Sequence, residues 1–594
     1  MKSPVSVTLI ILSIVLLTSA YHFRWKNEQW KYAVHTDAYS YNRYLPMIFI
    51  FQEFDDDKDN PDVIKYFIGT ALFYAPFFFL ACAGSFIFGL PVDGYSMLFP
   101  VFTSIGTIFY LIVGLYFLSK FLAYYFARSW IICTLLCTIA FGTMAFFYTV
   151  NAPGWAHIVA FSVVCFLLYH LKKILVDFNK GSIVAILVSS SLLFFIRPSD
   201  IIILVIAPFL ANDFKTFLVF LKKVFSEKKT LLLGGILALI PLICQLSIYK
   251  GYRDEFFVWS YTKEKFDFLH PEVIKVLFGY EKGLFIYTPI CFIALLGLIR
   301  LFKINRFLFT GIILYSLLNI YIISSWWCWN YGCIYGPRVF IEHYPLFFLL
   351  LGFLLDSLNR LLKTALIACI VLLSMLNLFQ TYQAVIGVLD HDFRTTSAGY
   401  WDVFLRTDRG NSGKFYKIPL DESKENVVSR TRLFNDMERA DSMWLNPHTL
   451  VNEKSYSGKQ SSKVNHINNF SVGIRKKMSE LPYNKDVLVR VSAWFYIPEK
   501  GSNSYLAMSF VSGGRCYRFQ PTGLDGFMQH YGEWEHHVFE TYMPKLKEEA
   551  EKDKGKQIEF YYFNNSQMDC YIDDLSIEFI QFKKMERVLD LSWE

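Results

Sequence analysis

The chain has 594 residues and carries 58 Lys and Arg against 51 Asp and Glu, a formal net charge of +7. Hydrophobic residues make up 54% of it and charged residues only 18%, whereas a soluble chain normally has about 25% charged residues. This composition excludes a disordered chain, a collagen-like repeat, a disulfide scaffold and a purely cytosolic enzyme. The modest net charge, found mostly in short loops, gives nucleic-acid binding no support.

Long apolar segments fill the first 390 positions. Because about 20 apolar residues are needed to cross a bilayer, they predict eleven spanning helices, at 4–20, 97–118, 130–149, 157–171, 182–196, 200–221, 231–249, 284–301, 307–324, 340–358 and 364–386. The first segment follows Lys2 and could also be a signal peptide, but no small-residue cleavage site leads into a soluble start. We therefore expect an uncleaved helix with a cytoplasmic N-terminus.

The segment 63–90 is also apolar and long enough to cross, and its placement decides the side of every later loop. If it does not cross, the short outward turns hold only Arg197 and Arg338, which agrees with the positive-inside rule. The inward loops then carry Lys120, Arg128, Lys172, Lys173, Lys180, Lys215, Lys222, Lys223, Lys228, Lys229, Arg300, Lys303, Arg306, Arg360 and Lys363. We therefore expect 63–90 to be a re-entrant or surface-lying helix, broken at Pro76.

With this topology, the outer side receives 21–96, 150–156, 197–199, 250–283, 325–339 and everything after 386. In a bacterium this side is the periplasm, so the prediction is a multi-pass inner-membrane protein. Cys516 and Cys570 would lie on an oxidising side and could pair if their strands are neighbours.

Acidic residues of the first outward loop are candidates for chemistry. Asp37, in H-T-D-A-Y-S-Y-N-R-Y-L-P (35–46), could be a general base in a partly dry cavity, or it could begin a helix together with Thr36. Asp93, in P-V-D-G-Y-S, could be a second active-site carboxylate or a turn residue. The acidic run formed by Asp55, Asp56, Asp57 and Asp59 could bind a divalent ion or form a solvated loop.

Two further outward turns carry single basic residues. His157 ends N-A-P-G-W-A-H (151–157) and could hydrogen-bond a phosphate or sugar, or be a satisfied interfacial histidine. Arg197, in the tight hairpin F-I-R-P-S-D (195–200), is costly at that depth unless it is paired with an anion or a carboxylate.

The stretch S-W-W-C-W-N-Y-G-C-I-Y-G-P-R-V-F-I-E-H-Y-P (325–345) combines aromatic residues with turn residues. Its aromatic residues could form a belt at the membrane interface. Gly332 and Gly336 instead indicate a shaped turn. Arg338 closes this turn, and its guanidinium suits a pair of phosphate oxygens. Glu342 or His343 could orient Arg338.

One chemical hypothesis uses these residues together. A sugar on a lipid phosphate would sit at the outer face, with Arg338 and Arg197 neutralising the leaving phosphate and Asp37 taking a proton from an acceptor hydroxyl. A phosphate leaves as a stable anion, so no general acid is needed, unlike in glycoside hydrolysis. Such a direct displacement would invert the anomeric centre.

An Asp in the first outward loop, a juxtamembrane helix before the second span and a G-P-R turn before a late span resemble the GT-C superfamily of membrane glycosyltransferases. Within it, residues 1–390 are most similar to polyprenyl-phosphate-sugar-dependent enzymes, the protein O-mannosyltransferases and the lipid A aminoarabinose transferase. The resemblance implies that Asp37 matches the catalytic acidic residue of the family's first loop and that 63–90 matches the juxtamembrane helix. Two departures are Ala38, where many relatives have a second acid, and His157 in place of an Asp.

The remainder of the chain is predicted to be a linker or neck at 387–430, a β-sandwich at 431–582 and a tail at 583–594. Alternating strands such as V-L-V-R-V-S-A-W-F-Y-I (487–497) support this. With S-Y-S-G-K-Q-S-S (455–462) and the final Y-I-D-D-L-S-I, they resemble a jelly-roll carbohydrate-binding module. Exposed aromatics such as Trp444, Tyr517 or Trp534 could stack on a sugar or belong to the core. Equally, the sandwich could lack sugar affinity and support the membrane domain.

The sequence therefore predicts a GT-C-like catalytic domain at 1–386. The predicted activity is that of a hexosyl- or pentosyltransferase, which moves a sugar from a polyprenyl-phosphate carrier to a periplasmic protein, lipid A or surface glycan. The alternative is a non-enzymatic membrane protein, either a translocase of lipid-linked sugars or a glycan-binding envelope scaffold. A translocase should carry charges along a path inside its spans, and the predicted helix middles carry few. The sequence identifies no cofactor with certainty, and a divalent metal could be bound by the acidic residues.

Overall fold

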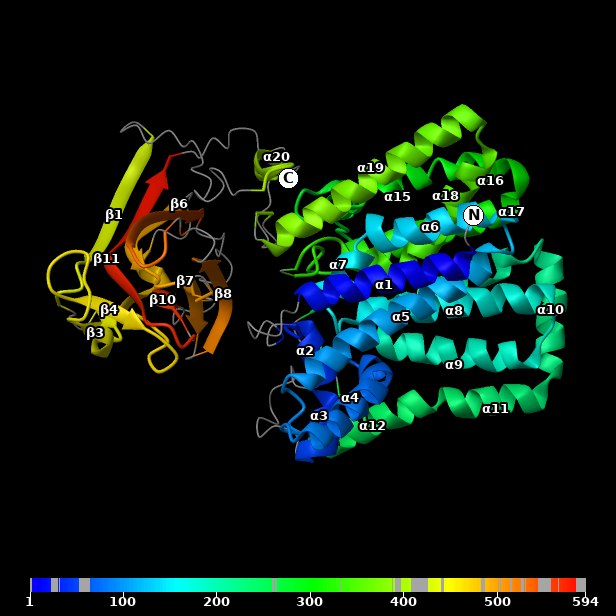
Figure 1. The fold of residues 1–594 in the computed structure, drawn as a ribbon, viewed down its shortest axis with the longest axis horizontal. Helices are drawn as coiled ribbons and strands as arrows, with labels where there is room; N and C mark the ends of the chain where they lie inside the picture. Colours follow the sequence, from blue (N-terminus) through cyan, green and yellow to red (C-terminus); the bar gives the residue numbers. More distant parts are fainter. Residues whose placement is uncertain are drawn as a thin grey trace. The chain divides into compact units, whose positions relative to one another are not determined.

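The computed structural model describes residues 3–22, 30, 33–52, 65–258, 261, 264–332, 334–386, 388–389, 397–407, 426–439, 443–481, 487–499, 501–502, 504–512, 515–524, 528, 530–542, 557–564 and 566–583. The chain forms two compact units, Met1–Thr395 and Thr396–Glu594. The first is helical and the second is built from antiparallel strands (Figure 1). The acidic run from Asp55 to Asp59 lies outside the described residues.

Long apolar helices form the first unit, as its sequence predicts. Among the described residues, eight are long and apolar enough to cross a membrane, or nine if one bent pair counts as a single span. The single helices among them are α1 (Pro4–His22), α4 (Gly69–Phe88), α5 (Leu98–Leu122), α8 (Ala156–Val176), α17 (Arg306–Ser324) and α19 (Arg360–Val385). Two more are composite: α11 (Lys228–Ala238) with α12 (Ile240–Arg253), and η6 (Arg338–His343) with α18 (Tyr344–Ser357). In Figure 1, α5, α8 and α9 (Lys180–Ile196) run side by side.

The predicted number of eleven spans is too high, because several predicted spans are short or interrupted. The 130–149 segment splits into α6 (Ser129–Gly142) and α7 (Ala145–Val150) at Thr143, whose extended backbone ends one helix and whose hydroxyl accepts the Ala145 N–H at 3.1 Å. The 200–221 segment becomes η5 (Pro198–Leu210) and α10 (Phe214–Ser226), which meet at 109°. The 284–301 segment forms α14 (Leu284–Tyr287), α15 (Pro289–Ala294) and α16 (Gly297–Ile304).

The helix α4 corrects the prediction of a break at Pro76, because it is continuous through that residue. Proline removes a backbone donor and strains the preceding turn. Here the Tyr110 hydroxyl donates to the Phe73 carbonyl at 2.5 Å, and Phe77 packs on Phe109, so contacts with α5 hold both halves in line. These contacts, with Gly84 against Leu98, place α4 beside the first half of α5. The placement of this segment as a re-entrant or surface-lying helix stays a prediction.

The second unit is an antiparallel β-sandwich with two sheets. One has the order β3-β4-β11-β6-β9, with β1 also paired to β11, and the other has the order β2-β5-β10-β7-β8. The strands predicted from alternation are present as β6 (Val487–Tyr496), β7 (Tyr505–Ser512), β8 (Arg515–Gly523), β9 (Trp534–Tyr542), β10 (Gln557–Phe563) and β11 (Cys570–Phe582). The shorter or more polar ones are β1 (Val427–Asn435), β2 (Trp444–Leu445), β3 (Leu450–Val451), β4 (Ser461–Val464) and β5 (Gly473–Lys477).

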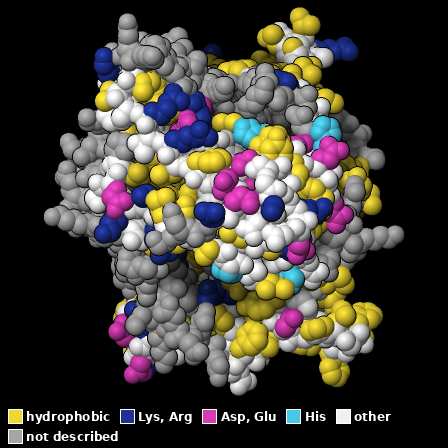
Figure 2. Space-filling model, turned by 90° about the vertical axis from the view of Figure 1, so that its left-hand side faces the viewer, with side chains coloured by type: hydrophobic (Ala, Val, Ile, Leu, Met, Phe, Trp, Pro, Cys, Tyr) yellow, Lys and Arg dark blue, Asp and Glu magenta, His cyan; other side chains and the backbone are white. Residues whose placement is uncertain are grey.

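The core of the sandwich lies between the sheets and includes Phe495, Phe510, Tyr562 and Ile577. Trp444 belongs to this core, so it is not a surface platform for sugar. Trp534 is half-buried, and the side chain of Tyr517 is outside the described part. Figure 2 shows acidic, basic and hydrophobic side chains interspersed on the face that it draws.

The two cysteines that were candidates for a disulfide lie on strands that are not neighbours. Cys516 is on β8, which pairs with β7 in the five-stranded sheet, whereas Cys570 begins β11 in the other sheet. A disulfide between Cys516 and Cys570 was expected only if their strands were neighbours, and the strand order shows that they are not.

Candidate active site

An ion pair between Asp37 and Arg338 connects an early loop of the helical unit with a late one. Arg338 Nη2 lies 3.1 Å from Asp37 Oδ2, across 301 positions of the chain. Asp37 is the first residue of α2 (Asp37–Asn42), and Arg338 is the first residue of η6. Thr36, just before α2, has a positive φ of 51°, which few residues other than glycine adopt. The backbone thus turns sharply at the point where it presents the Asp37 carboxylate.

The turn before Arg338 has the shape that its glycines predict. Gly332 and Gly336 have φ of 89° and 76°. A Cβ at Gly336 would lie 2.1 Å from Met144 Sδ, so the backbone there passes directly against a buried side chain. The Tyr148 hydroxyl donates to the Tyr335 carbonyl at 3.1 Å and fixes the same turn from α7. These contacts hold Arg338 in one place.

Arg338 is buried, with its guanidinium 4.5 Å from the centre of the Trp155 ring. The Asp37 side chain is 29% exposed, so the pair lies at the edge of a covered site and one of its members reaches the surface. A guanidinium has five N–H donors. Arg338 can therefore keep its bond to Asp37 and still bind an anion.

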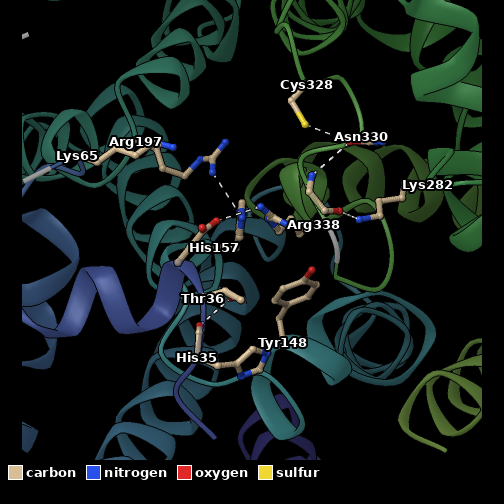
Figure 3. A network of polar contacts seen from close by, with 12 residues as sticks. His35, Thr36, Lys65, Tyr148, His157, Arg197, Lys282, Cys328, Asn330 and Arg338 are labelled. Atoms are coloured by element: carbon tan, nitrogen blue, oxygen red, sulfur yellow. Dashed lines mark hydrogen bonds and ion pairs between the residues drawn. The ribbon is translucent and has the colours of Figure 1, made fainter. Parts of the chain in front are cut away.

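A second cluster surrounds Arg197. Arg197 Nε lies 3.1 Å from Glu342 Oε1 and 3.3 Å from Asp200 Oδ2. His157 Nδ1 lies 3.2 Å from Glu342 Oε2, and its Nε2 lies 3.5 Å from Arg197 Nη1 (Figure 3). The predicted partner of Arg197 is thus a pair of carboxylates, since burying a charge is favourable only with such a partner.

The remaining predicted residues occupy different places. His343 is buried, and its Nδ1 lies 2.6 Å from the Tyr315 hydroxyl, away from Arg338. Asp93 accepts the backbone N–H groups of Tyr95 and Ser96 at 2.8 and 2.6 Å, in the turn before α5. Burial alone would raise the pKa of Asp93, but these two bonds outweigh it and lower the pKa below its ordinary value. The Asp93 carboxylate therefore stabilises the turn in which it lies.

Sequence reasoning missed Lys282. This lysine is buried, donates to the Gly332 carbonyl, and shares a small pocket with Arg338. Asn330 and Tyr331 line the same pocket, together with apolar residues such as Trp329 and Pro337. Figure 3 shows Lys282, Asn330 and Arg338 close together. Two buried cations beside an apolar wall form a setting that suits an anionic group.

Two tyrosines complete the surroundings of Asp37. Tyr66 lies near Asp37, and its ring lies 4.4 Å from the ring of Tyr41. Burial, followed by the neighbouring Tyr41 and Asp37, raises the pKa of Tyr66, so its hydroxyl remains a donor at neutral pH. The Asp37 carboxylate thus lies near these two tyrosines and is hydrogen-bonded to the Arg338 guanidinium.

A metal ion could be held by Asp200, Glu342 and His343, whose ligand atoms all lie within 4.8 Å of one another. Carboxylate and imidazole groups are suitable ligands for several divalent ions. However, the Arg197 guanidinium already contacts both carboxylates and supplies the positive charge that they need. The three residues therefore fit a metal poorly, and the chemistry below uses none.

Searches of protein families and of curated proteins found no match. Among solved structures, the arabinosyltransferase EmbB from Mycobacterium smegmatis matches 95% of this chain and 64% of its own, with 8% identity and a TM-score of 0.35. The CBM22-1 xylan-binding domain from Paenibacillus barcinonensis matches 25% of this chain and 94% of its own, with 13% identity and a TM-score of 0.18. A family 22 carbohydrate-binding module of Clostridium thermocellum matches 26% of this chain and 94% of its own, with 14% identity and a TM-score of 0.17.

Proposed function

We propose that the chain is a membrane glycosyltransferase that moves a sugar from a polyprenyl-phosphate carrier to a hydroxyl acceptor on the outer side of a bacterial inner membrane. The observation that carries the proposal is the contact of Asp37 with Arg338 at 3.1 Å. It puts a carboxylate that can take a proton next to a cation that can bind a phosphate. The acceptor class includes a protein, lipid A or a surface glycan.

The reaction is a single displacement. The acceptor oxygen forms a bond to the anomeric carbon while its proton passes to the Asp37 carboxylate. The bond between the anomeric carbon and the phosphate oxygen breaks, and its electron pair leaves with the carrier phosphate. Arg338 neutralises the charge that develops there. Because the acceptor enters opposite to the leaving phosphate, the product has inverted configuration.

Lys282 and Arg197 have separate roles in this proposal. Lys282 lines the pocket beside Arg338 and gives the carrier phosphate a second cation. Arg197, held by Glu342 and Asp200, fixes His157, which in turn stacks with Trp155 at 6.4 Å between ring centres. Trp155 also lies under Arg338. The buried cluster thus supports the residue that binds the phosphate.

The competing function is a translocase of lipid-linked sugars or a glycan-binding scaffold. The catalytic proposal is favoured because the charged residues of the site lie at helix ends and in loops: Asp37, Arg338, Arg197 and Lys282. The β-sandwich could then bind the acceptor glycan, as its resemblance to carbohydrate-binding modules suggests.

The experiment that tests the function is donor consumption by membranes. Membranes with and without the protein are incubated with a panel of labelled polyprenyl-phosphate sugars, both hexoses and pentoses. We expect the free carrier phosphate and a labelled, non-lipid product to form with at least one donor only when the protein is present. Transport of a donor across the bilayer with no cleavage would instead support the translocase.

A further inference from the structure

The helix α10 (Phe214–Ser226) presents an uncovered surface at one end of the helical unit. None of its residues is fully buried. It follows η5 after a bend of 109° and is followed by α11, which begins at Lys228. Figure 1 shows α10 running across the ends of α8, α9 and α11, at the end of the unit opposite to α2. It therefore lies across the direction of the helices that it connects.

Two contacts fix α10 at this end. Lys223 Nζ lies 4.1 Å from the centre of the Phe178 ring, in the loop between α8 and α9. Glu227, directly after α10, pairs with Lys180 at 2.7 Å at the start of α9. At the start of α10, the Asp213 carboxylate accepts the Thr216 N–H at 2.7 Å. The helix is thus capped and joined to the α8–α9 connection.

Half-buried apolar, exposed apolar and lysine side chains lie on different faces of α10. Phe217, Phe220, Leu221 and Val224 are half-buried. At 100° per residue, the exposed side chains Phe214, Leu218 and Phe225 form a strip beside that face, and Lys215 and Lys222 come next. Val219 is exposed among the polar residues and is the one exception.

The charge at this end is strongly basic. The segment 213–229 contains five lysines and only two acidic residues, Asp213 and Glu227. The lysines are Lys215, Lys222, Lys223, Lys228 and Lys229. An exposed apolar strip bordered by lysines is the pattern of a helix that lies in the boundary between hydrocarbon and lipid headgroups. Lysines at this depth are attracted to anionic lipids. A helix lying across the unit at the end of the spans is at the height of that boundary.

We propose that α10 is an anionic-phospholipid-binding helix: Phe214, Leu218 and Phe225 enter the acyl boundary, and Lys215, Lys222 and Lys223 bind headgroup phosphates. The occupant of this surface is thus the headgroup layer of the bilayer itself. The proposal is independent of glycosyl transfer.

The test is hydrogen–deuterium exchange of the full chain in nanodiscs of phosphatidylcholine alone or of phosphatidylcholine with phosphatidylglycerol at 7:3. Because headgroup binding suppresses local opening, we expect the amides of 214–226 to exchange at least about fivefold more slowly in the anionic discs. The triple variant Lys215→Gln, Lys222→Gln, Lys223→Gln should lose this difference. The matched triple variant Lys454→Gln, Lys459→Gln, Lys477→Gln, with the same charge removed from the β-sandwich, should keep it.

Two results would overturn the proposal. One is equal exchange of 214–226 in the two kinds of disc. Another is a lipid difference that survives in the Lys215, Lys222 and Lys223 triple variant. If the equal exchange is also fast in both lipids, this face is left for a protein partner.

Discussion

The Arg338 side chain has three neighbours that define its chemistry: the Asp37 carboxylate, the Trp155 ring and a pocket that it shares with Lys282. The first neutralises its charge, the second covers one face of its guanidinium, and the third places a second buried cation beside it. In a site with little water, a charge-assisted hydrogen bond to a phosphate is stronger than in solution. The proposed binding of the carrier phosphate therefore depends on Arg338 and Lys282 together.

The position of Lys282 beside Arg338 predicts that replacing this lysine weakens donor binding. In Lys282→Met, loss of a charged donor to the carrier phosphate should raise the donor KM by about ten- to a hundredfold, since such bonds contribute about 1.5–3 kcal/mol. Lys282→Arg should recover part of the affinity because it keeps the charge. The measurement is initial rates over a range of donor concentration at saturating acceptor. Unchanged donor KM in Lys282→Met, with normal melting behaviour, would remove Lys282 from the phosphate site.

Asp37 and Arg338 were individually identifiable from the sequence, because an acid and an arginine in outward polar turns of an apolar chain need an explanation. Their contact was not, because it depends on packing between residues 301 positions apart. Asp200 was overlooked since a hairpin residue after proline has an ordinary local role. Lys282 was overlooked because its burial and its bond to the Gly332 carbonyl exist only in the folded chain.

At the scale of elements, the turn from Gly332 to Arg338 positions the site, and Gly336 is its tightest point. Alanine at Gly336 would be strained at φ 76° and would also push Met144 away. We expect Gly336→Ala to lower stability by about 1–2 kcal/mol more than Gly89→Ala. Gly89 is the matched control, because its φ is 64° but nothing lies within 4 Å of an added Cβ. Thermal melts of both variants check this, and equal losses would contradict it.

The β-sandwich gives a prediction on pH. Asp573 in β11 accepts the backbone N–H groups of Tyr456 and Ser457 at 2.7 and 3.1 Å, and burial raises its pKa to about 6. A raised carboxyl pKa means that the folded state holds the proton more tightly. The contribution of this group is therefore fully present below its unfolded pKa and is lost as the pH rises through about 6.

Thermal unfolding of the full chain between pH 4 and pH 7.5 measures this effect. We expect the difference in Tm between the original protein and Asp573→Asn to shift against the original protein as the pH rises from 4 to 7. Parallel pH profiles of the two proteins would show that Asp573 titrates near its ordinary value. A relative gain by the original protein at high pH would show that the shift has the opposite sign.

Elements were predictable where one local pattern dominated. Uninterrupted apolar runs gave α5, α8 and α19, and strict alternation gave β6. The pattern failed where a single residue or a tertiary contact decides the outcome. Thr143 divides a run that hydropathy joins, and packing of α4 on α5 keeps α4 continuous at Pro76 although proline predicts a break. Strands β2 and β3 have two residues each, too few for any periodicity.

At the scale of the whole molecule, the account requires that the site residues share one side of the membrane. We expect an alkaline phosphatase fused after residue 390 to be active in a bacterial host, and one fused after Phe178 to be inactive. The reason is the lysine-rich set of loops, which the positive-inside rule keeps in the cytoplasm. The reverse pattern of activities would place Asp37 and Arg338 in the cytoplasm.

The most direct test of the central claim is the rate of sugar transfer by Asp37→Asn. Asparagine keeps the size of the side chain and its place beside Arg338 but cannot take the acceptor proton, so kcat should fall by about a hundredfold or more. The matched control is Asp267→Asn, because Asp267 is a half-exposed carboxylate that bonds within its own turn to His270. The account predicts that Asp267→Asn transfers sugar at the original rate while Asp37→Asn, with the same melting temperature, does not. Equal transfer by both variants would show that Asp37 is not the base.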